Sequence, residues 1–164
     1  MSQGMDKGKL LDNLRRQCSR REYCSSDIRR KIADACRKSP ESFRDSSPEA
    51  LAEEILASLR KDNYLSDARY ASAFARDKAS LSGWGAIKIR HALASKGISA
   101  SDRDAALDSV EDEGAKRRLE KLLRTKAVAL AGDPQRRLKL LRFALGRGYS
   151  YDEVEDLVDA LTRP

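Results

Sequence analysis

The sequence predicts an all-α protein built from three tandem three-helix units that stack into an elongated, curved array. No segment alternates apolar and polar residues among β-branched types, as a strand would. Nine aromatic residues in 164 leave Leu, Ile and Ala to form the core, a composition that favours helices. Residues 85–98 also align with residues 136–149, which indicates an internal repeat. Because one such unit buries little by itself, neighbouring units must stack.

The first unit is predicted over residues 9–65, after a flexible tail of residues 1–8. A helix is expected from about residue 8 to residue 18, and Ser26 is interpreted as the N-cap of a second helix. A third helix is expected to open at Ser47-Pro48, because proline is tolerated at the first helical position. The apolar positions that recur with a helical period are Ile28, Ile32, Ala35, Cys36, Leu51, Ile55 and Leu59.

The second unit is predicted over residues 66–113. The Asn-Tyr-Leu-Ser-Asp segment at 63–67 is expected to end the preceding helix and to cap the next one, whose apolar residues are Tyr70, Phe74 and Leu81. The two aromatic residues are assigned to the core. A second helix ends at a Lys-Gly-Ile sequence, where Gly97 supplies the left-handed residue that follows a last turn. An acidic helix is expected over 101–112, with its early carboxylates near the positive end of the helix dipole.

The third unit, residues 114–164, repeats this order. It begins with a helix over 114–131 whose inner face carries leucines. The Arg-Gly-Tyr sequence at Gly148 is the second copy of the glycine cap. Ser150 and Glu153 have the spacing of a capping box and open a final acidic helix.

The net charge of +7 is the sum of basic and acidic segments that alternate along the chain. The basic segments 15–38, 68–96 and 114–147 carry net charges of +6, +5 and +9, and the acidic segments 39–67, 97–113 and 148–164 carry −4, −5 and −4. In each predicted unit the first two helices are therefore basic and the third is acidic. Stacking in register would align the basic helices as one stripe.

Several classes of function are excluded by what the sequence lacks. The longest apolar run, 127–131, is too short to cross a membrane, and no secretion signal is recognisable. Three cysteines without paired spacing are expected to be reduced thiols in a cytoplasm. His91 is the only histidine, and the Gly83-Trp84-Gly85 sequence lacks the third glycine and the preceding strand of a dinucleotide site. We therefore expect no enzyme activity, no metal and no cofactor, and interpret Trp84 as filling a gap at a turn between helices.

The basic stripe is the strongest candidate for a functional surface. It would bind phosphates with strong salt dependence and little reading of base sequence. The competing interpretation is a solvated face that balances the nearby acidic helices. The candidate residues are Arg29, Arg30, Lys31, Arg69, Lys88, Arg90, Lys96, Arg117, Lys121, Arg124, Arg136, Arg137, Lys139 and Arg142.

Two segments of the middle unit, 63–74 and 83–98, resemble the RecX family of recombination regulators. The family pattern is Gly-Tyr-Leu-x-Asp-x-x-Tyr-Ala-x-x-Phe, a Gly-x-Gly, and an isoleucine helix that ends Leu-x-x-Lys-Gly-Ile. Its counterparts in this chain are Tyr64, Asp67, Tyr70, Phe74, Gly83, Gly85, Ile89, Leu93 and Gly97. Asn63 replaces the first glycine, but asparagine also tolerates the left-handed conformation, so the turn is expected to survive. Cys36 replaces the glycine expected at the end of the first unit's second helix, which makes that unit atypical.

The resemblance implies a bacterial cytoplasmic protein, expected to be a monomer, that acts in DNA repair, recombination and the SOS response. Such a protein binds the RecA recombinase in the groove of its nucleoprotein filament and restrains filament growth, strand exchange and ATPase activity. It uses no cofactor and no membrane, and the basic stripe would add weak DNA binding without sequence specificity. Two alternatives remain: a stand-alone DNA-binding protein of the helix-turn-helix kind, acting in transcription, and a helical-repeat adaptor for another protein.

Overall fold

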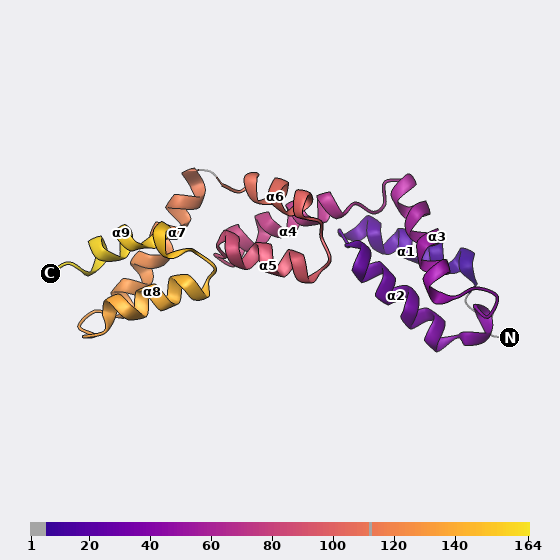
Figure 1. The fold of residues 1–164 in the computed structure, drawn as a ribbon, viewed down its shortest axis with the longest axis horizontal. Helices are drawn as coiled ribbons and strands as arrows, with labels where there is room; N and C mark the ends of the chain where they lie inside the picture. The colour runs from indigo at the N-terminus through magenta and orange to yellow at the C-terminus, as the bar shows by residue number, and fades with distance from the viewer. Residues whose placement is uncertain (1–5, 112) are drawn as a thin grey trace. The chain divides into compact units, whose positions relative to one another are not determined.

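The computed structural model describes residues 6–111 and 113–164, and throughout these residues the chain is helical with no strand (Figure 1). The described part contains α1 (Lys7–Arg20), α2 (Ser25–Lys38), a 3₁₀ turn (Pro40–Ser42), α3 (Pro48–Lys61), α4 (Asp67–Leu81), α5 (Ala86–Ser95), α6 (Ala100–Asp108), α7 (Glu113–Ala129), α8 (Arg136–Gly146) and α9 (Tyr151–Thr162). The all-α prediction is confirmed.

Side-chain caps fix where many of these helices begin. Asp6 accepts a hydrogen bond from a first-turn backbone N–H of α1, and Ser47 and Ser99 do the same for α3 and α6. At α9, Ser150 and Glu153 form the predicted capping box, with each side chain bonded to the other's backbone N–H. The starts predicted at Ser47 and Ser150 are confirmed, whereas the caps at Asp6 and Ser99 differ from the expected starts at about residue 8 and at residue 101.

Left-handed residues follow three helices at the predicted positions. Gly97 has a φ of 73° after α5, and Gly148 has a φ of 94° after α8. Asn63, after α3, has a φ of 59°, so asparagine adopts the conformation for which a glycine was expected. The glycine-cap prediction and the tolerated substitution at Asn63 are both confirmed.

The first compact unit comprises Met1–Ala71 together with Lys96–Ile98. Within it, α2 packs against α1 and α3. Its core of buried residues consists of Leu10, Leu14, Ile28, Ile32, Cys36, Phe43, Leu51, Ala52, Ile55, Leu56, Leu59 and Leu65. Helices α2 and α3 supply most of this core, and the apolar positions predicted for them supply half of it, with Ala35 only partly buried.

The second compact unit comprises Ser72–Ser95 and Ser99–Pro164. Here α5 packs against α6, and α7, α8 and α9 pack against one another. The core of the last three helices contains Leu119, Leu123, Ala127, Leu140, Leu141, Ala144, Val154 and Val158. The division into units 9–65, 66–113 and 114–164 stays a prediction.

Some local expectations are corrected. Ser26 does not cap α2, which begins at Ser25, and its hydroxyl donates to a distant carbonyl instead. Leu81, assigned to the apolar face of its helix, is the last residue of α4 and has 84% of its surface exposed. The aromatic rings of α4 that were assigned to the core are only half-buried. Of the predicted tail, residues 1–5 lie outside the described residues, whereas Lys7 begins α1.

Candidate functional site

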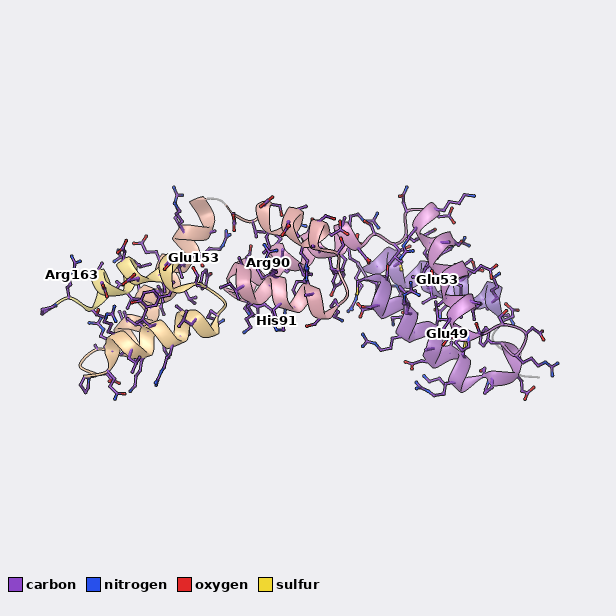
Figure 2. All side chains as sticks on the ribbon, in the orientation of Figure 1. Glu49, Glu53, Arg90, His91, Glu153 and Arg163 are labelled. Atoms are coloured by element: carbon purple, nitrogen blue, oxygen red, sulfur yellow. The ribbon has the colours of Figure 1, made fainter. Side chains whose placement is uncertain are left out.

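Three arginines each bind a carboxylate on the helix that follows their own along the chain. The three pairs are Arg29 with Glu53, Arg90 with Asp104, and Arg137 with Asp159. Figure 2 shows Glu53 on α3 and Arg90 on α5. In the third pair the Arg137 Nε donates to the Asp159 Oδ1 at 2.7 Å. Part of the alternating charge of the sequence is thus neutralised by ion pairs between consecutive helices.

Five more candidate cations also bind carboxylates. These pairs are Arg30 and Lys96 with Asp27, Arg69 with Glu22, Arg124 with Glu120, and Lys139 with Asp133. The hydrogen bond from Lys139 holds the pKa of Asp133 below its ordinary value, as that from Arg29 does for Glu53. The Asp27 carboxylate is largely buried, whereas the other three pairs are more exposed, and exposed pairs stabilise a fold by only about 0–1 kcal/mol. A phosphate or another protein's carboxylate can therefore replace such a partner at little cost.

The remaining candidates contact rings or backbone, or lie on exposed surfaces. The Lys31 Nζ lies 5.0 Å from the Tyr23 ring centroid, and the Lys88 Nζ lies 4.4 Å from that of Trp84. The Arg136 Nε donates to a backbone carbonyl at the end of α7. Exposed positions on α7 and α8 are occupied by Arg117, Lys121 and Arg142. The predicted stripe along all three helix groups stays a prediction.

Two residues of the family-like motif stabilise the first compact unit. The ring of Tyr64 packs against the unit's core, and the Arg15 Cζ lies 5.9 Å from its centroid. The Asp67 Oδ1 accepts a hydrogen bond of 2.7 Å from the backbone N–H of Ser25, the first residue of α2. Cys24, the N-cap of α2, makes no side-chain cap bond, so Asp67 caps this helix from far along the chain.

We predict that Asp67→Ala lowers the free energy of unfolding by about 1–2 kcal/mol, because it leaves the N–H of Ser25 without this acceptor. Asp67→Asn keeps an oxygen in place and should restore most of the loss. Thermal unfolding followed by circular dichroism measures both variants. The exposed Asp77 of α4 provides a control, and an equal loss in Asp77→Ala would contradict the capping role.

The turn after α5 docks at the start of α2. The Ser26 Oγ donates to the Lys96 carbonyl at 2.8 Å, and the Lys96 Nζ donates to the Asp27 Oδ1 at 2.8 Å. Ile98, two residues after Lys96, is buried, with a relative exposure of 3%. Lys96, a candidate for the basic stripe, therefore has a structural contact inside the first compact unit.

The turn after α8 docks in the same way at the start of α5. The Gly85 N–H donates to the Arg147 carbonyl at 2.7 Å, and the Ile87 N–H donates to the Gly148 carbonyl at 3.0 Å. A Cβ added to Gly85 would lie 2.5 Å from the Gly148 oxygen, and one added to Gly148 would lie 2.2 Å from the Lys88 Cβ. The two glycines allow this backbone approach, which sequence reasoning missed.

The other motif residues complete the packing of the second compact unit. The rings of Phe74 and Trp84 meet edge to face with centroids 6.3 Å apart, so Trp84 fills the turn between helices as predicted. Gly83 has a φ of 64° in that turn, and Ile89 and Leu93 of α5 are buried. The motif is therefore a packing motif in this structure.

The three cysteines are free, and burial raises the pKa of the Cys24 and Cys36 thiols. In the part of the chain that the structure describes, no group of three or more His, Cys, Asp or Glu side chains could hold a metal ion. No helix within the described ranges is both long enough and apolar enough to cross a membrane.

Residues 66–107, which span α4, α5 and nearly all of α6, match the family model described as RecX, second three-helix domain. The chain is also similar to the protein called Regulatory protein RecX of Cronobacter sakazakii, with 28% identity over 90% of this chain and 88% of that one. The protein of the same name from Salmonella typhimurium is 26% identical over 91% of this chain and 89% of its own length.

Two solved structures have the same fold. The crystal structure of a regulatory protein RecX superposes with a TM-score of 0.77 and 25% identity, covering 93% of this chain and 71% of that one. That of RecX from Lactobacillus salivarius gives a TM-score of 0.78 at 20% identity, covering 95% and 96% of the two chains. The likeness thus extends well beyond the matched domain.

Proposed function

We propose that this chain, a protein of the RecX family, binds the RecA recombinase on DNA and restrains filament growth, strand exchange and ATP hydrolysis. The observation that carries the proposal is the similarity to proteins named Regulatory protein RecX over about nine-tenths of the chain. RecA regulation is what that name implies. The place of action would be the bacterial cytoplasm, where a recombinase meets DNA.

The exposed ion pairs support a mechanism of charge exchange. A filament of protein and DNA presents phosphates and charged side chains of both signs, and the second and third helices carry both signs as well. In a pair such as Arg90–Asp104 the arginine can bind a phosphate and the aspartate a cationic side chain of the filament, since the exposed pair itself contributes little free energy in water. Because such contacts are spread along the chain, affinity would build up through several weak sites.

The direct test is RecA-dependent ATP hydrolysis on single-stranded DNA with this protein added. We expect inhibition at amounts below one protein per RecA monomer, because a filament modulator acts on many protomers at once. An unchanged hydrolysis rate in the presence of excess protein would refute the proposal.

A charge variant of the second compact unit tests the mechanism. We predict that replacing Lys121, Arg137, Lys139 and Arg142 together by Ala weakens binding to single-stranded DNA. The slope of log affinity against log salt concentration should fall in magnitude by about 3, at ~0.7 per lost phosphate contact. Arg136 is left intact because its guanidinium bonds the end of α7. Fluorescence anisotropy across a salt series measures the slope.

The matched control removes the same charge outside the predicted stripe. Its four exposed targets are Arg37, Lys38, Arg44 and Lys61. If both quadruple variants lose affinity and slope equally, net charge alone accounts for binding and the predicted surface is wrong.

A further inference from the structure

An open cleft of about 550 Å³ lies on the second compact unit, between the end of α4 and the helices α7 and α8. Its apolar lining includes Leu81, Leu122 and Phe143. Leu81 is 84% exposed, although a leucine gains about 1.5–3 kcal/mol when it is fully buried. Burial of this side chain by a partner would contribute that free energy to binding.

The other part of the lining is basic. Arg118, Lys121, Lys126 and Arg147 contribute to the cleft, and no acidic residue is among the described residues that line it. The neighbouring Glu120 is bound to Arg124 instead. A cleft with four cations and an apolar surface is complementary to an anionic partner that also carries an apolar group.

The aromatic ring in the cleft is already in contact with cations. The Lys126 Nζ and the Arg147 Cζ each lie 5.2 Å from the Phe143 ring centroid. The Arg147 guanidinium is further held by a hydrogen bond of 2.6 Å to the Ser82 carbonyl. Single-stranded nucleic acid binds through open aromatic platforms as well as charge. A phosphate backbone would also leave Leu81 uncovered, so these features favour a peptide.

We propose that this cleft binds an acidic segment of a partner protein, with a leucine or phenylalanine of that segment seated against Leu81 and Leu122. Glutamates and aspartates beside that residue would then meet Lys121 and the other three cations. The inference goes beyond the proposed function, since it assigns a peptide site by chemistry and holds whatever the partner protein is.

The test uses the full chain and a fluorescein-labelled synthetic peptide, Glu-Asp-Glu-Leu-Phe-Glu-Asp-Glu. A second peptide of equal charge has serine in place of leucine and phenylalanine. We expect the first peptide to bind roughly tenfold more tightly, since burial of one such side chain contributes on the order of the free energy of a tenfold change in affinity. Equal affinities would mean plain charge attraction and would overturn the proposal.

Leu81→Ser locates the site without changing any charge. The substitution should lower the affinity for the first peptide roughly tenfold and leave folding intact, because an exposed side chain contributes little to the core. Val128→Ser is the matched control, since Val128 is 74% exposed on α7 but does not line the cleft. Equal effects of the two substitutions, or none, would overturn the assignment.

A single-stranded oligonucleotide of the same net charge separates peptide from nucleic acid. Its affinity should be the same for the natural chain and for Leu81→Ser. If the oligonucleotide loses as much affinity as the peptide does, the cleft belongs to nucleic acid and the proposal fails. Failure of RecA regulation with intact peptide binding would leave this site standing.

Discussion

Gly148→Ala should destabilise the second compact unit by about 2–5 kcal/mol, the sum of a left-handed backbone penalty and an overpacking penalty. The added Cβ would lie 2.2 Å from the Lys88 Cβ and 2.6 Å from the Lys88 nitrogen. The backbone at Gly148 also has a φ of 94°, which an L side chain rarely adopts. A change of rotamer relieves neither conflict, because the clash involves the Lys88 Cβ and backbone nitrogen and the strain lies in the backbone of residue 148 itself.

Gly85→Ala isolates the steric part of this effect. A Cβ there would lie 2.5 Å from the Gly148 oxygen, and the substitution should cost about 1–3 kcal/mol by overpacking. Gly146, the last residue of α8, is the control, because a Cβ there meets no atom within 4 Å. Gly146→Ala should be neutral or stabilising by up to about 1 kcal/mol, since alanine favours a helix more than glycine does.

Urea unfolding of the three variants, followed by circular dichroism, gives the free energies directly. The expected order of stability is Gly146→Ala, then Gly85→Ala, then Gly148→Ala. If Gly85→Ala matched Gly146→Ala, the docking of the α8–α9 turn on the start of α5 would be wrong.

The helix boundaries were predictable because their determinants are local. A serine cap, a proline at the first position or a glycine after the last turn acts within a few residues, so Ser47, Ser150 and Gly97 could be assigned from their neighbours. Ser26 was assigned wrongly because its hydroxyl reaches the Lys96 carbonyl, a partner that no local pattern specifies. Asp67 was recognised as a motif residue, yet its bond to Ser25 depends on the same tertiary packing.

The alternation of basic and acidic helices was predictable from the sequence, but the ion pairs that these helices form were not. Basic second helices and acidic third helices can be recognised in the chain, and both a phosphate-binding stripe and a self-balancing surface agree with them. The pairs Arg29–Glu53 and Arg137–Asp159 depend on which helix faces lie together, which periodicity alone does not fix. They show that part of the charge is balanced within the units.

Breaking the Lys96–Asp27 pair should destabilise the first compact unit by about 2 kcal/mol, less than the 3–5 kcal/mol of a fully buried pair, because Lys96 keeps some contact with water. The Asp27 side chain is only 13% exposed, and that of Lys96 is 36% exposed. Lys96→Met retains the apolar stem but removes the ammonium that donates to Asp27. The carboxylate then keeps its hydrogen bonds within α2 and loses its principal counter-charge.

The effect should depend on pH in a defined way. Burial raises the pKa of Asp27, but hydrogen bonds from Lys96 and Cys24 outweigh it and hold the pKa below the ordinary 3.8. The hydrogen bond to Asp27 raises the pKa of Lys96 above the ordinary 10.5. A carboxyl group whose pKa is lowered on folding stabilises the fold at pH values above its unfolded pKa, and this stabilisation is lost as the pH falls through its folded pKa. An amine whose pKa is raised on folding stabilises the fold at pH values below its unfolded pKa, and this stabilisation is lost as the pH rises through its folded pKa.

The difference in stability between the natural chain and Lys96→Met should therefore stay constant between about pH 5 and pH 9 and shrink below about pH 4, as Asp27 takes up a proton. Urea unfolding at a series of pH values measures the difference. Arg44→Met is the control, because Arg44 and Glu41 form an exposed pair 3.5 Å apart that should contribute about 0–1 kcal/mol. A Lys96→Met deficit that persisted undiminished at acid pH would show that Lys96 acts through its stem and not through its charge. The turn after α5 would then be held by the Ser26 hydrogen bond and the burial of Ile98 alone.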